Sequence, residues 1–292
     1  MRTEDDPTSL VVEEMFAAAY KAHPYGHPVI GWMDDLKAIT LEDVKRHYRT
    51  YYVPNNAVLV IVGDFQTHRA LELVRRTFGA IPRGPDPPRR HVVEPPQLGE
   101  RRVFVRKEAE LPFVFAGYRV PSAGHPDAYA LDVLETLLSS GKSSRLYRSL
   151  VYEKALAVYV GGSYDGMAAG PTLFYVYGGL RPGITPQAFE EALYAEVQRL
   201  AREPVSPREL QKAKNRIEAA FIMSQDSTFY RAMRLGRLES IGVGYRYLED
   251  YLERIRAVTA EDVQRVVRKY LVPDRRTVGI LLPKPRTKGK AP

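Results

Sequence analysis

The sequence predicts an α+β protein built from two copies of a layered unit, with a mostly antiparallel sheet and helices on one side. Two observations support this fold class. A helix–turn–strand pattern over residues 39–64 returns over residues 258–283, without a gap and at a constant offset of 219. Between the copies, pairs of strand-like segments alternate with grouped helical segments, which is typical of an antiparallel α+β layer.

The first copy predicts a capped helix, a tight turn and a buried strand. Thr40 is placed to cap the helix, and Glu42 and Asp43 follow in the first turn, where the helix dipole favours anions. Pro54 ends the helix and turns the chain. Residues 57–62 are a continuous apolar and largely β-branched run, the pattern of a strand buried on both faces.

The second copy repeats polar as well as apolar positions. The matched pairs are Thr40 and Thr259, Glu42 and Glu261, Asp43 and Asp262, Val44 and Val263, Arg46 and Arg265, Arg49 and Arg268, Tyr51 and Tyr270, Val53 and Val272, Pro54 and Pro273, Ile61 and Ile280. Shared caps, arginines and a Tyr-x-Val-Pro stop favour duplication over chance similarity. Only 38 residues precede the first copy, so we expect the first unit to lack its early part, through a late gene start or because the chain is a fragment.

The domain prediction follows from this repeat. Residues 1–79 are expected to be the C-terminal part of the first unit, with helices over residues 9–22 and 67–78. Residues 80–99 hold six prolines and no periodic pattern, which indicates a semi-rigid linker. A sheet without its early strands exposes edges and apolar faces. We therefore expect residues 1–79 to be poorly stable alone and residues 100–283 to fold independently.

The second unit is predicted to be complete over residues 100–283, followed by a basic tail over residues 284–292. Its strands are expected over residues 101–107, 111–120, 156–163 and 171–179, before the repeated strand. A helix is expected over residues 126–140, and residues 141–146 link it to a second helix that ends near residue 153. Further helices are expected over residues 185–200, 206–223, 227–241 and 245–256, before the repeated helix. Thr185 and Ser206 are the predicted caps of two of these helices.

Composition excludes several classes of function. The chain has no cysteine, so disulfides, thiolate metal sites and cysteine nucleophiles are excluded. The net charge of +8 is spread over helices with acidic neighbours, which favours solvated faces over nucleic-acid binding. No apolar run approaches the length of a membrane span. The compartment stays open between cytoplasm and periplasm.

Two short motifs are candidates for ligand sites. His23 and His27 have the spacing of a helical zinc pair, but Pro24 and Gly26 between them exclude the helix that would align them. A structural loop is the favoured interpretation, with loop metal binding as the alternative. The Gly-Lys-Ser at residues 141–143 lacks the upstream glycine of a phosphate loop and does not follow a strand.

Several segments, in this order and spacing, resemble one family of enzymes. The segments are Arg2-Thr-Glu-Asp-Asp-Pro7, His23-Pro-Tyr-Gly26, Val29-Ile-Gly31, Tyr51-Tyr-Val-Pro-Asn-Asn56, Val60-Ile-Val-Gly-Asp64, Ser143-Ser-Arg-Leu146 and Glu153-Lys-Ala-Leu-Ala157. They resemble the pitrilysin or insulinase-type zinc metallopeptidases, whose relatives include mitochondrial processing peptidase. The resemblance covers the whole chain except the tail.

The resemblance implies peptide hydrolysis with zinc, held in the full-length family by two His and a Glu, with the Glu of H-x-x-E-H activating water. The sequence contains no H-x-x-E-H. In the family that motif lies in the part of the first unit that is expected to be missing here. We therefore predict that this chain holds no catalytic residue and binds no zinc.

The family's second unit can carry an Arg and a Tyr, seven residues apart, that reach the substrate. The register of that pattern is fixed by Leu150, Ala155, Leu156 and Ala157. The matching substrate-binding positions are then Val151 and Val158, which cannot donate a hydrogen bond. Tyr152 and Tyr159 each lie one residue away from the pattern, and Arg145 and Tyr152 repeat its spacing in another place.

In two-chain members of the family, one subunit keeps zinc and the other keeps the Arg/Tyr pair. The resemblance therefore implies the back part of a zinc-bearing subunit. Its partners would be a peptide or unfolded protein substrate and an Arg/Tyr-bearing homologous subunit, as a heterodimer, or a second copy, as a homodimer. The alternative is a non-catalytic structural or peptide-binding subunit of a peptidase complex.

Overall fold

A computed structural model describes residues 5–89 and 92–284. The chain divides into two compact units. The first consists of Met1–Pro28, Val93–Ala219 and Asp250–Pro292, and the second of Val29–Val92 and Ala220–Glu249. The predicted domain boundaries near residues 80 and 100 stay a prediction.

The first unit contains a five-stranded sheet in the order β1-β5-β2-β4-β3. The strands are β1 (Arg101–Glu108), β2 (Phe113–Val120), β3 (Ala157–Tyr164), β4 (Thr172–Leu180) and β5 (Arg276–Lys284). Only β1 and β5 pair in parallel, and the other neighbours are antiparallel. The prediction of an α+β fold with a mostly antiparallel sheet is therefore confirmed.

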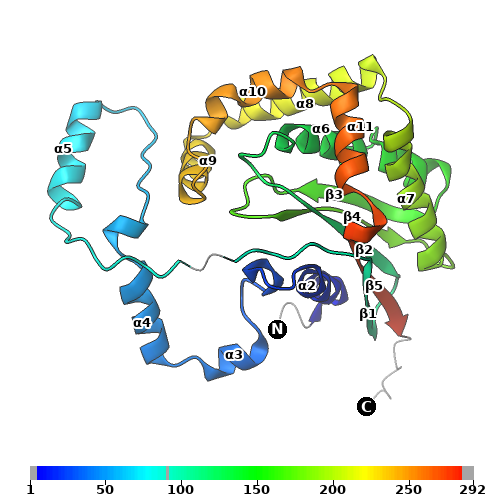
Figure 1. Ribbon diagram of the computed structural model, residues 1–292, viewed down its shortest axis with the longest axis horizontal. Helices are drawn as coiled ribbons and strands as arrows, with labels where there is room; N and C mark the ends of the chain where they lie inside the picture. Colours follow the sequence, from blue (N-terminus) through cyan, green and yellow to red (C-terminus); the bar gives the residue numbers. More distant parts are fainter. Residues whose placement is uncertain (1–4, 90–91, 285–292) are drawn as a thin grey trace, which may run out of the picture. The chain divides into compact units, whose positions relative to one another are not determined.

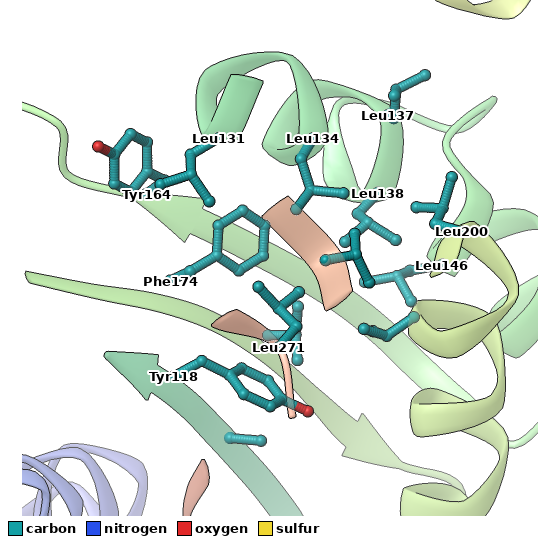
Figure 2. Packing of buried hydrophobic residues seen from close by; sticks show 14 of the residues in the cluster. Tyr118, Leu131, Leu134, Leu137, Leu138, Leu146, Tyr164, Phe174, Leu200 and Leu271 are labelled. Atoms are coloured by element: carbon teal, nitrogen blue, oxygen red, sulfur yellow. The ribbon is translucent and has the colours of Figure 1, made fainter. Parts of the chain in front are cut away.

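One face of the sheet packs against a helical layer. This layer consists of α6 (Ala128–Ser139), α7 (Pro186–Arg202) and α11 (Ala260–Tyr270) (Figure 1). Tyr118 and Phe174 project from β2 and β4 into the core that these helices close, together with Leu131 and Leu134 of α6 (Figure 2). Alternate residues of β2 and β4 face this core because successive strand side chains point to opposite faces.

The opposite face of the sheet carries α2 (Pro7–Ala19), which packs against β1, β5 and β2. Val11 and Met15 of this helix are completely buried. A Cβ atom at Gly279 would lie 2.7 Å from Cγ1 of Val11, so the glycine permits the close approach of α2 to β5. The sequence predicts helices on one side of the sheet. The helices α6, α7 and α11 form that layer, whereas α2 packs on the opposite side.

Further helices complete the chain in sequence order. In and around the first unit they are η1 (Pro24–Gly26), the π-helical turn η3 (Tyr147–Glu153), α8 (Pro207–Ser224), α10 (Tyr247–Ala257) and η4 (Pro273–Arg275). The predicted caps are confirmed, because Thr185 Oγ1 accepts the N–H of Ala188 and Ser206 Oγ accepts the N–H of Glu209. Among the described residues, no helix combines the length and apolar character that crossing a membrane requires.

The second unit is helical where the structure describes it. Its helices are α3 (Met33–Ala38), α4 (Leu41–Tyr51), η2 (Pro54–Asn56), α5 (Thr67–Thr77) and α9 (Thr228–Ser240). The predicted cap of α4 is confirmed by a reciprocal pair of hydrogen bonds between Thr40 and Asp43. The same reciprocal bonds join Thr259 and Asp262 at the start of α11. The duplication itself stays a prediction.

The predicted strand over residues 57–62 is wrong. These residues form no strand, and Val58, Leu59 and Ile61 each expose about half of their side-chain surface. The matched segment in the second copy forms β5, which receives ladder hydrogen bonds from β1 and β2. A strand requires such neighbours, and the described part of the second unit has none. The predicted tail, apart from Lys284, lies outside the described residues.

Candidate functional site

The last strand of the sheet, β3, offers an open edge. It pairs with β4 alone, so its outer backbone groups have no strand partner in the described part of the chain. The register shifts between Ala157 and Tyr159, which makes Val158 the extra residue of a β-bulge. Bulges re-aim side chains at sheet edges and beside functional sites. An open edge is also the surface to which an extended peptide can add as a further strand.

Beside this edge lies a cluster that we call the aromatic face. It consists of Phe113, Phe115, Tyr159, Tyr175 and Tyr177, which lie on the same side of the sheet as α2. Phe115 stacks on Tyr175 with ring centroids 4.9 Å apart and on Tyr177 at 5.9 Å. Phe113 and Phe115 are buried, and Tyr175 and Tyr177 pack against them as partly buried residues. Tyr159 is 45% exposed, so it is the ring of this cluster that a ligand can reach.

Glycines in β3 and β4 create the space for two of these rings. A Cβ atom at Gly179 would lie 2.4 Å from Cε1 of Tyr159, and one at Gly161 would lie 2.5 Å from the hydroxyl oxygen of Tyr177. The two tyrosines therefore lie flat across backbone that carries no side chain. Glycine within a strand marks such close approaches.

The aromatic face borders a cavity of about 530 Å³. Phe113, Tyr159, Gly179 and Leu281 line it from the sheet, and the start of α2 and the β1–β2 connection line the rest. Burial raises the pKa of Tyr159, and the nearby Tyr177 and Asp6 add to the shift. The Tyr159 hydroxyl therefore stays protonated at neutral pH and can donate a hydrogen bond. The cavity has the size of a small-ligand or side-chain pocket.

The two predicted substrate-binding positions lie on neighbouring elements. Val151 is buried in η3, and Val158 is half exposed in the bulge of β3. Between them, Ala155 has a positive φ of 51°, a conformation that favours glycine. A valine side chain cannot donate a hydrogen bond, so neither position offers a side-chain donor to a substrate. Tyr152 is 81% exposed on η3, whereas Tyr159 belongs to the aromatic face.

The described residues do not fit a zinc site. They contain no group of three or more His, Asp or Glu side chains that could hold a metal ion. Nδ1 of His23 accepts the N–H of Tyr25 and thereby caps the short turn η1, which accords with the structural interpretation of that loop. The predictions of no bound zinc and no catalytic residue in the whole chain stay predictions.

Sequence reasoning missed the aromatic face. The signal was present in β4, where Leu173, Tyr175 and Tyr177 alternate with residues of the main core. Strand periodicity alone could place these side chains on one face. It could not show that β3 ends the sheet, because strand order depends on contacts between segments that are far apart in the sequence.

The chain is similar to known proteins over most of its length. Residues 38–217 match the family model described as the peptidase M16 inactive domain. The zinc protease PqqE of Helicobacter pylori is 30% identical over 285 residues, which cover 97% of this chain and 64% of that protein. The chain thus spans less than two thirds of the length of the first curated relatives that it matches.

Solved structures show the same similarity. A protease from Helicobacter pylori superposes with a TM-score of 0.92 at 31% identity, covering 97% of this chain and 68% of that one. The inactive peptidase domain of a putative zinc protease from Bordetella parapertussis superposes with a TM-score of 0.57 at 29% identity. That match covers 63% of this chain and 98% of the other.

Proposed function

We propose, from the premise that the chain belongs to the peptidase M16 family through its inactive domain, that it is the non-catalytic, peptide-binding part of a zinc metallopeptidase. The observation that carries the proposal is the open edge of β3 beside the aromatic face. The peptide is held here, and the zinc-dependent cleavage belongs to another part of the full-length paired enzyme.

The edge and the aromatic face act on different parts of the bound peptide. Backbone groups of β3 pair with an extended peptide whatever its sequence, as in other strand additions. Phe113, Tyr159 and Leu281 offer apolar contacts to one side chain of the peptide. Charged residues line the rest of the same cavity, namely Asp5, Lys107, Glu108 and Glu110. The arrangement suits unfolded segments, since a folded protein presents few free strand edges.

The valines at positions 151 and 158 support a role for a second subunit, which would supply the missing hydrogen-bond donors. A valine cannot donate a hydrogen bond to a developing oxyanion, which is the role that the family's Arg/Tyr pair performs. An Arg/Tyr-bearing homologous subunit, or a second copy in a homodimer, would then complete the enzyme. Zinc would be held by the H-x-x-E-H portion of the family, and none of these groups is contributed by the described residues.

A binding and cleavage assay tests this function. We expect the purified chain to bind a fluorescent unfolded peptide and to leave it intact when zinc is added. Zinc-dependent cleavage that a chelator abolishes would show that the chain carries its own catalytic site. Failure to bind any unfolded peptide would contradict the binding role.

The alternative is a purely non-catalytic subunit of a peptidase complex. An open reading frame upstream of Met1 that encodes H-x-x-E-H favours a subunit of the zinc enzyme. A stop codon close upstream of Met1 favours the non-catalytic subunit.

A further inference from the structure

A second cavity lies between η3, α7 and the beginning of α8, and no residue of β3 lines it. Its volume is about 480 Å³. Five basic side chains contribute to its lining: Arg145, Arg148, Arg199, Arg208 and Lys212. Three acidic side chains also line it: Glu153, Glu196 and Glu209. The lining therefore carries a net positive charge at neutral pH.

Two of the acidic side chains already form ion pairs with arginines. Nε and Nη2 of Arg145 donate to the two carboxylate oxygens of Glu209 at 2.7 and 2.8 Å, a bidentate pair. Hydrogen bonding from Arg145 lowers the pKa of Glu209, so this carboxylate stays ionised and paired. Nε of Arg148 donates to Glu153 at 2.7 Å.

The third acid, Glu196, is held by its own neighbours. Its Oε1 accepts the hydroxyl of Ser149 at 2.8 Å in a buried hydrogen bond. Lys154 and Arg199 approach its carboxylate at 3.6 and 3.5 Å. None of the three carboxylates forms an ion pair with Arg208 or Lys212 within the part of the chain that the structure describes.

The remaining donors are unneutralised. Arg208 is exposed and forms no ion pair with any described residue. Nζ of Lys212 donates to Oγ of Ser143 at 2.8 Å, which satisfies a donor but not the charge. Nη1 of Arg145 is buried and has no hydrogen-bond partner among the described residues. A buried guanidinium N–H without a partner is costly. An anion that enters the cavity would meet the unneutralised charges of Arg208 and Lys212.

We propose that this cavity is a binding site for a small phosphate-bearing ligand. Guanidinium forks and an ammonium group that converge from three elements suit the several oxygens of a phosphoryl group better than the two of a carboxylate. The volume exceeds that of a single phosphate ion and falls in the range of small-molecule pockets. Pyrophosphate or an organic phosphate therefore fits better than orthophosphate alone.

The test is a calorimetric titration of the full chain with pyrophosphate, orthophosphate and acetate at low ionic strength. We expect pyrophosphate to bind more tightly than orthophosphate, and acetate to bind least. The double variant Arg208→Ala/Lys212→Ala removes the two unneutralised charges and should weaken pyrophosphate binding at least about tenfold. The double variant Arg106→Ala/Arg202→Ala is the matched control, because it also removes two exposed charges and neither residue lines the cavity.

Circular dichroism is used to check that the variants fold, as we expect because Arg208 and Lys212 are exposed. Equal loss of binding in the control and in the Arg208→Ala/Lys212→Ala variant would show a diffuse charge effect and overturn the proposal. It is also overturned if pyrophosphate does not bind, or if acetate binds as tightly as pyrophosphate. Peptide binding at β3 is measured separately, so the two proposals fail independently.

Discussion

The carboxylate of Glu94 lies 2.8 Å from Nη1 of Arg119, and the Glu94 side chain is only 2% exposed. The same carboxylate accepts the backbone N–H groups of Lys21, Ala22 and His23, each at 2.8 Å. One buried acid thus ties the segment after α2 to strand β2. Because α2 covers the face of the sheet that carries the aromatic cluster, Glu94 helps to hold that face in place.

Glu94→Ala is expected to lower the free energy of unfolding by about 3–5 kcal/mol, because it leaves the charge of Arg119 buried without its partner. Urea denaturation followed by circular dichroism measures the change. Glu203→Ala is the control, since Glu203 is 66% exposed and pairs with Arg199 at 3.4 Å. An exposed pair contributes about 0–1 kcal/mol. Equal effects of the two substitutions would contradict the role assigned to Glu94.

The buried Asp127 should make stability depend on acidic pH. Burial by itself would raise the pKa of Asp127, but hydrogen bonds from Tyr270, Arg265 and Lys269 outweigh it and hold the pKa well below 3.8. The pKa is lower in the folded state, so this contribution is fully present above the unfolded pKa. It is lost as the pH falls below about 4.

Asp127→Asn tests this dependence. At neutral pH the variant is expected to be less stable by about 2 kcal/mol, the contribution of hydrogen bonds to a charged group. The difference from the unmodified chain should shrink as denaturation is repeated at decreasing pH below about 4. A difference that stays constant down to the acid transition would show that Asp127 does not titrate as described.

The aromatic face predicts a contrast between two neighbouring tyrosines. Tyr159→Ala removes a ring that lines the 530 Å³ cavity and should weaken unfolded-peptide binding about tenfold, a typical effect of losing an aromatic anchor. Tyr152→Ala is the matched control, because Tyr152 is 81% exposed on η3 and lies outside the cavity lining. Fluorescence anisotropy measures both affinities. Equal affinities of the two variants would exclude the aromatic face as the binding surface.

The strained backbone at Ala155 predicts a stabilising substitution. Its φ of 51° costs about 1–2 kcal/mol for a residue with a Cβ atom. Glycine would relieve this strain, but its greater flexibility in the unfolded chain offsets part of the stabilisation. Ala155→Gly should therefore raise the free energy of unfolding by about 0.5 kcal/mol. Ala195→Gly, at an exposed position inside α7, should lower it by about 1 kcal/mol. Destabilisation by both substitutions to the same extent would contradict the strain.

The two copies of the repeated pattern show what sequence reasoning could predict. Thr40 and Thr259 cap their helices through the same reciprocal hydrogen bonds, because a cap involves residues only three positions apart. The strands that follow differ. Residues 276–284 lie between two neighbours in the sheet, whereas residues 57–62 have no strand beside them in the described chain. Local signals predict helices, while strands depend on distant partners.

The candidate site was predicted only in part for the same reason. The motif register identified Val151 and Val158 as the positions of the family's Arg/Tyr pair, and they lie on η3 and in the bulge of β3. The bulge and the open edge depend on the pairing of β3 with β4. No pattern within residues 151–158 shows that pairing.

Hydrogen–deuterium exchange of the full chain, with zinc and an excess of an unfolded peptide, tests the central claim most directly, because mass spectrometry reads the chain and the peptide together. We predict that backbone amides of β3 between Val158 and Ser163 exchange more slowly with peptide, while the amides of β1 are unchanged and the peptide keeps its full mass. Unchanged exchange along β3, or a peptide cleaved by this chain, would contradict the account.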